Sequence, residues 1–88
     1  MRKTETILKE RQKQHGSFKT HAEAEVGLQR VVQEAGLYYS QATAVQDIGL
    51  QMILHKVARI ISGGLNHSDS WEDIAGYATL VAKDMADE

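Results

Sequence analysis

The sequence contains no cysteine, no proline and no long apolar run. The lack of cysteine excludes disulfides, thiolate catalysis and zinc sites with thiolate ligands. The lack of proline removes the residue that most often breaks a helix. No segment reaches the roughly 18 consecutive apolar residues that a membrane span needs, and no signal-peptide core follows the first residues. We therefore expect a cytoplasmic protein that does not associate with membranes.

Aromatic residues make up only 6% of the chain, and none of them is interleaved with Lys9, Arg11 and Lys13. Residues 1–19 carry six Lys or Arg and two Glu, whereas the remainder carries four Lys or Arg and ten acids. This segment is either a solvated terminal helix or a basic arm that reaches an acidic neighbouring subunit. Nucleic-acid binding is not predicted, because no aromatic side chain is placed to stack on a base.

Four segments with helical periodicity predict an all-α protein, with a single domain over residues 1–88. We expect a polar helix or arm within residues 1–16, ended by Gly16, and core helices within residues 20–86. The second helix is predicted to begin with a capping box at Thr20-His-Ala-Glu23 and to end at Gly36. The third, over about 42–62, is about 30 Å long and ends at Gly63-Gly64. The fourth is predicted to begin with a cap at Ser70. The expected fold is a compact four-helix domain with a long third helix.

The third helix is apolar on two faces. Its main stripe consists of Leu50, Ile53, Leu54, Val57, Ile60 and Ile61, and its second face carries Val45, Ile48 and Met52. A continuous core stripe is also predicted for the fourth helix, from Trp71 to Met85, and Gly76 within it favours close approach of another helix or a ligand. An 88-residue chain buries only about 60% of the surface that its unfolded form exposes. We therefore expect a homo-oligomer, formed through the second face of the third helix and through the first helix.

Charged residues cluster where the third helix ends and the fourth begins. An antiparallel hairpin would bring Lys56 and Arg59 near Asp69 and Asp73. Three interpretations are open: an ion-pair network that fixes helix register, a phosphate or nucleotide site, and a divalent-cation site on the two acids. In the phosphate site, Lys56 and Arg59 would donate to the anion and Asp73 would orient them. His15 and Tyr77 would line that site.

The four histidines do not predict a zinc site. No two of them have the His-x-x-x-His spacing that places two imidazoles on one helix face. His21 and Glu25 are one turn apart and could share a metal ion or a proton, although a surface pair is the simpler interpretation. His55 is interpreted in the same way, and His67 is expected to bond within its loop.

Three motifs resemble an uncharacterised helical family that is common in phages and prophages. They are Arg11-x-x-x-His-Gly16, Met52-x-x-x-Lys-x-x-Arg59 and Asp69-Ser-x-x-Asp-x-x-Gly-Tyr77. The resemblance covers nearly the whole chain and implies a phage or prophage origin. It implies no particular activity.

The layout is also distantly similar to the all-α nucleotide pyrophosphohydrolases of the MazG and dUTPase type. That similarity implies a helical oligomer that binds magnesium through Glu-x-x-Glu on one helix and Glu-x-x-Asp on the next. Here Glu23 and Glu25 are only two residues apart, and Gly76 replaces the last metal acid. The magnesium site left by these departures would consist of Glu25, Asp69 and Asp73.

Three function classes follow. The leading hypothesis is a non-catalytic binder of a nucleotide or another phosphate. The alternatives are a helical interaction or structural protein without a small-molecule ligand, and a degenerate magnesium-dependent pyrophosphohydrolase. No Ser-His-Asp arrangement or phosphate-binding glycine loop is present, so nucleophilic catalysis is not predicted.

Overall fold

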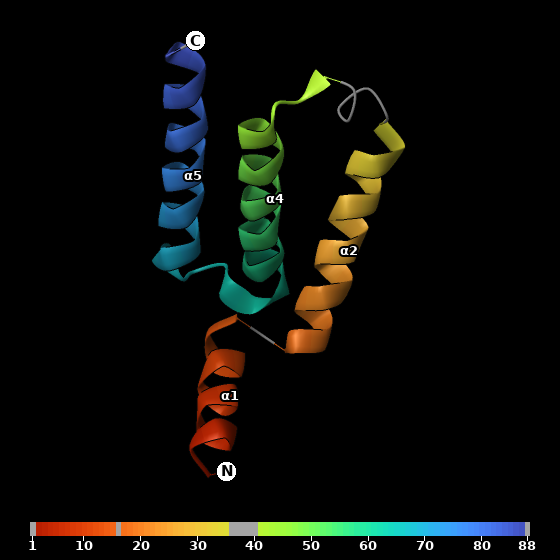
Figure 1. Cartoon of the computed structure of the whole chain (residues 1–88). Coiled ribbons are helices and arrows are strands. Elements are labelled where there is room, and N and C mark those ends of the chain that lie inside the picture. The colour runs from red at the N-terminus through yellow and green to blue at the C-terminus, as the bar shows by residue number, and fades with distance from the viewer. Residues whose placement is uncertain (1, 16, 36–40, 88) are drawn as a thin grey trace.

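The computed structural model describes residues 2–15, 17–35 and 41–87, together with their side chains except those of residues 2 and 11–15. All regular structure in these ranges is helical, which confirms the predicted all-α class. The elements are α1 (Arg2–His15), α2 (Phe18–Ala35), α4 (Ala44–Arg59), the π-helical turn η1 (Ile60–Gly64) and α5 (Ser68–Ala86). Figure 1 shows α2, α4 and α5 side by side, while α1 extends beyond the end where η1 lies. Among these residues, no helix is both long enough and apolar enough to cross a bilayer. The predicted helix ends at Gly16 and Gly36 lie outside the described residues.

Two predicted helix starts are corrected by the structure. At α2, Ser17 is the capping residue, because its Oγ accepts a hydrogen bond from the Thr20 backbone N–H at 3.1 Å. Thr20 therefore lies inside the first turn, and its hydroxyl contacts Ser17 Oγ at 2.7 Å. Helix α5 begins at Ser68, two residues before the predicted cap at Ser70. Ser70 is instead a buried residue of the first turn.

Helix α4 begins with a complete capping box. Thr43 Oγ1 accepts from the Gln46 backbone N–H at 3.1 Å, and Gln46 Oε1 accepts from the Thr43 backbone N–H at 3.0 Å. These two bonds satisfy backbone donors that the first turn leaves without partners. At its other end the α-helix stops at Arg59 and continues as η1, which widens the last turn. Gly63 has a φ of 143°, a left-handed conformation that favours glycine, so the predicted end at the glycine pair is confirmed.

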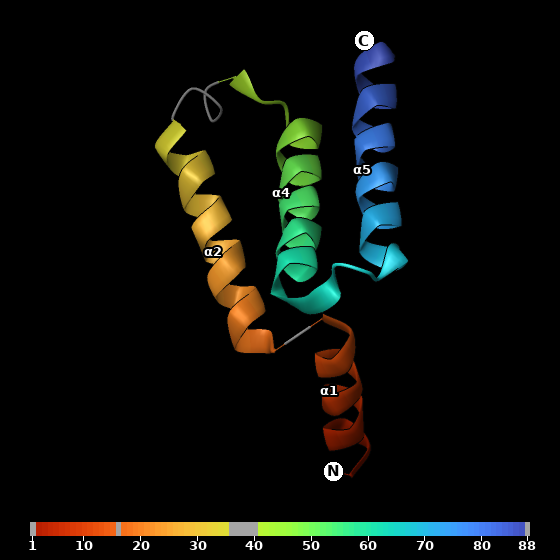
Figure 2. The same cartoon turned by 180° about the vertical axis from the view of Figure 1, so that it is seen from behind.

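Helix α4 is the central element, as predicted, because it packs against both α2 and α5. Figure 2 shows the same order from behind. The core is thin: in the described part of the chain, the buried hydrophobic side chains are those of Ala58 and Ile60. Several residues of the predicted α5 core stripe, including Trp71 and Met85, are exposed. The single chain thus covers only part of the apolar surface that its helices present.

The molecule is more extended than the compact domain that the sequence predicts. Its radius of gyration is 15.1 Å and its extents are 48 × 27 × 25 Å. A globular chain of this length has a radius of gyration of about 12 Å. The difference has a visible cause, since α1 packs on η1 at one end and does not fold back along the other helices (Figure 1).

Candidate functional site

The predicted meeting of charges between α4 and α5 is partly confirmed. Lys56 lies in the last turns of α4, and its Nζ is 3.0 Å from Oδ2 of Asp73 in the second turn of α5. The Lys56 side chain is only 14% exposed, whereas that of Asp73 is 48% exposed. This pair joins the two helices, as the ion-pair interpretation predicts. It also means that the ammonium group proposed for a phosphate site already has an anionic partner.

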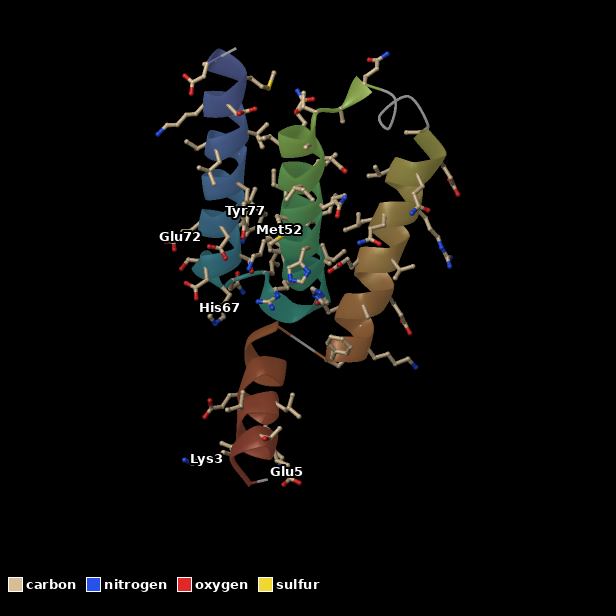
Figure 3. The ribbon with its side chains drawn as sticks, viewed as in Figure 1. Lys3, Glu5, Met52, His67, Glu72 and Tyr77 are labelled. Atoms are coloured by element: carbon tan, nitrogen blue, oxygen red, sulfur yellow. The ribbon has the colours of Figure 1, made fainter. Side chains whose placement is uncertain are left out.

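Among the described side chains, no other residue predicted for this hairpin forms an ion pair with Lys56 or Asp73. Arg59 lies close enough to α2 for its charge to influence His21 there. Asp69 is exposed in the first turn of α5. Tyr77 lines an apolar groove with Met52, and Figure 3 shows these two side chains between α5 and α4. The side chain of His15 lies outside the described part of the structure.

The structure instead brings together three polar side chains from α2 and α4. Glu25 Oε1 accepts a hydrogen bond from Nε2 of His21 at 3.0 Å and from Nδ1 of His55 at 2.6 Å. The side chains of His21, Glu25 and His55 are 11%, 25% and 32% exposed. The two imidazole rings meet edge to face, with centroids 4.9 Å apart. We call these three residues the His–Glu cluster.

The surroundings of the His–Glu cluster favour neutral imidazole at His21. Burial is the first cause that lowers the pKa of His21, and the neighbouring His55 and the positive charge of Arg59 lower it further. The hydrogen bond and the charge of Glu25 oppose this effect. Gln29, one turn further along α2, donates to the other carboxylate oxygen of Glu25 at 3.4 Å. Both oxygens of Glu25 are therefore oriented by partners within the chain.

Sequence reasoning paired two of the three residues of this cluster. The spacing of His21 and Glu25 placed them on one face of a helix, which the structure confirms. His55 is 30 residues further along the chain from Glu25, and its approach depends on how α2 rotates against α4. One feature of the sequence could have indicated this contact. The second face of α4 changes from apolar to basic near His55, and such a face favours an acidic side chain on the neighbouring helix.

The structure does not bring together the predicted magnesium ligands Glu25, Asp69 and Asp73. Within the described ranges, the only set of three side chains with ligand atoms close enough to share a metal ion is the His–Glu cluster. Glu25, on α2, contacts His55 of α4. Asp73, on α5, forms an ion pair with Lys56 of α4. Asp69 and Asp73 therefore do not have Glu25 beside them, as the magnesium hypothesis requires.

An apolar surface covers one side of the α4–α5 pair. It consists of Val45, Ile48, Met52, Tyr77 and Leu80, and we call it the hairpin face. Together with Ala44, Gly49 and Val81, these residues line a groove of about 370 Å³. Val45, Ile48 and Leu80 are among the large hydrophobic side chains that the chain leaves exposed. This surface extends the second apolar face that the sequence predicted for the third helix.

Comparison with known protein families shows a match for this chain. A family model described as DUF6378, a domain of unknown function, matches residues 1–85. The chain belongs to the DUF6378 family. Neither a curated protein nor a solved structure matches it. The matched range includes both the His–Glu cluster and the hairpin face, so both lie within the DUF6378 domain of this chain.

Proposed function

We propose that this DUF6378 protein is a homodimeric helical interaction protein, which assembles through the hairpin face. The observation that carries the proposal is the amount of surface that one chain leaves uncovered. Its accessible surface is 6690 Å². A compact monomer of 9.8 kDa exposes about 5200 Å².

The excess of about 1500 Å² is comparable with what assembly removes from each subunit. A standard interface buries about 800 Å² per partner, and obligate homodimers bury more. The sparse core points the same way, since a chain with few buried apolar side chains gains stability when a second copy covers its exposed ones.

The hairpin face is the best candidate for the interface. Its lining is apolar apart from the Tyr77 hydroxyl, and it carries three large exposed side chains. The wider groove beside it is less suitable, because Gln41 and Gln46 contribute to its lining and Met85 is its only large exposed hydrophobic residue. Two copies related by a two-fold axis would place their hairpin faces against each other and form a four-helix arrangement of two α4–α5 pairs.

Replacement of Ile48 by Glu tests this assignment. Ile48 is 57% exposed in the single chain, so the charge can be solvated in a monomer but not in the proposed interface. Sedimentation or light scattering should give twice the chain mass of 9.8 kDa for the wild type and the single chain mass for the variant. Val31→Glu is the matched control, because Val31 is 66% exposed but lies on α2, and this variant should remain dimeric. A monomeric wild type, or equal masses for the wild type and Ile48→Glu, would overturn the proposal.

The phosphate hypothesis remains a prediction with one structural argument in its favour. Arg59 is half-buried and forms no ion pair with any carboxylate that the structure describes. Inorganic phosphate or a nucleotide bound there should raise the melting temperature, and Arg59→Ala should abolish that rise. The phage origin and the relation to MazG-type enzymes likewise remain hypotheses, and magnesium-dependent nucleotide hydrolysis would be the test of the latter.

A further inference from the structure

The His–Glu cluster has the composition and spacing of a metal site. One ligand atom from each of His21, Glu25 and His55 lies within 4.8 Å of the other two, and Oε1 of Glu25 contacts Nε2 of His21 and Nδ1 of His55. Ligand atoms around a tetrahedral zinc ion, with bonds of about 2.0–2.2 Å, are about 3.3 Å apart. The observed separations of 3.0 Å and 2.6 Å from Glu25 to the two imidazoles therefore need to change by less than 1 Å.

The ligand types select the class of metal. Imidazole nitrogen suits zinc and the other late first-row metals, whereas magnesium and calcium prefer sites made of oxygen atoms. Two histidines and one carboxylate leave at least one coordination position for water or another ligand. The charge of Arg59 acts against a cation, but the carboxylate of Glu25 compensates for it within the cluster.

We propose that His21, Glu25 and His55 bind one divalent transition-metal ion per chain, with Zn²⁺ as the expected ion, and that this ion fastens α2 to α4. Such an ion would strengthen the attachment of α2, since no described residue of this helix is fully buried. The ion would replace the two hydrogen bonds that Glu25 accepts from His21 and His55. Each imidazole would then carry its proton on the ring nitrogen that faces away from the metal.

The test uses the full chain freed of metal and titrated with Zn²⁺ by calorimetry and with Co²⁺ by visible absorption. The expected result is one ion per chain, together with the absorption of Co²⁺ bound to nitrogen and oxygen ligands. His55→Ala and Glu25→Gln should each weaken Zn²⁺ binding at least about tenfold, because even residues that only orient metal ligands have effects of this size. Circular dichroism of the metal-free variants should show that they remain helical.

Two control variants separate this site from adventitious binding. His67→Ala removes a histidine outside the cluster, and Glu23→Gln changes an exposed acid of α2 that pairs only loosely with Lys19, at 3.9 Å. Both should bind Zn²⁺ as the wild type does. The proposal fails if the wild type binds no Zn²⁺, or if His55→Ala and Glu25→Gln bind it as tightly as the controls. In that case the cluster is a hydrogen-bonded triad only.

The metal site and the proposed dimer can fail independently. All three ligands come from one chain, so monomeric Ile48→Glu should bind one Zn²⁺ with wild-type affinity. A loss of binding in this variant would contradict a site contained within a single chain.

Discussion

At the scale of single residues, the Lys56–Asp73 pair is expected to be asymmetric. Lys56 is mostly covered and Asp73 is half exposed. Replacement of Asp73 by Asn leaves a covered ammonium group without its partner, whereas replacement of Lys56 by Met leaves a carboxylate that water can solvate. We expect Asp73→Asn to lower the free energy of unfolding by about 1 kcal/mol and Lys56→Met to lower it by less. Urea unfolding of both variants and of the double variant measures the difference and the coupling.

The same two variants distinguish the ion pair from an anion site. If Lys56 serves only as the partner of Asp73, phosphate should stabilise Asp73→Asn no more than it stabilises the wild type. A larger phosphate effect in this variant would show that the released ammonium group binds anions. An unfolding energy lowered more by Lys56→Met than by Asp73→Asn would contradict the asymmetry.

At the scale of helices, the contact between α4 and α5 depends on Gly49. A Cβ at this position would overlap Cγ2 of Val81, and a β-branched side chain has little freedom to turn away. We expect Gly49→Ala to lower the free energy of unfolding by about 1–2 kcal/mol, because overpacking outweighs the gain in helix propensity. Thermal or urea unfolding gives the value.

Gly27→Ala is the matched control for this prediction. Gly27 is an exposed helical position on α2 with nothing within 4 Å of an added Cβ, so alanine should stabilise it by up to about 1 kcal/mol. Stabilisation by both substitutions would show that the helices do not approach closely at Gly49. Gly76 is equally open within the described chain, so the close approach predicted there requires a second molecule.

Helix starts show what sequence patterns can and cannot specify. The capping-box pattern occurs at Thr20–Glu23 and at Thr43–Gln46, but the structure uses only the second as a cap. At α2 a competing hydroxyl, that of Ser17, lies three residues upstream and captures the Thr20 backbone N–H. A local pattern therefore predicts that a helix begins nearby, while its exact first residue depends on which neighbouring caps compete.

The contacts of the candidate site also differ in how far the sequence predicts them. The Lys56–Asp73 contact was predictable, because a short connection forces the end of α4 beside the start of α5. The partnership of Glu25 with His55 was not, since it depends on how α2 rotates against α4. Local geometry thus predicted the α4–α5 contact, and only the tertiary arrangement showed the His–Glu cluster.

At the scale of the whole molecule, the elongated shape and the thin core indicate that the chain folds and dimerises in one coupled step. If the dimer is the stable folded form, unfolding also dissociates it, and its melting temperature must rise with protein concentration. With an unfolding enthalpy of about 0.7 kcal/mol per residue over both chains, a tenfold increase in concentration should raise the melting temperature by about 4 °C. Calorimetry of the wild type over two decades of concentration measures this slope.

Ile48→Glu gives the decisive comparison for that slope. As a monomer it should melt at a lower temperature that does not change with concentration, while added Zn²⁺ should still raise that temperature through the His–Glu cluster. The two effects belong to different parts of the molecule, since the hairpin face joins chains and the cluster joins helices within a chain. A melting temperature of the wild type that is independent of concentration would mean that one chain is stable with its apolar face exposed. The hairpin face would then not be the dimer interface that we propose.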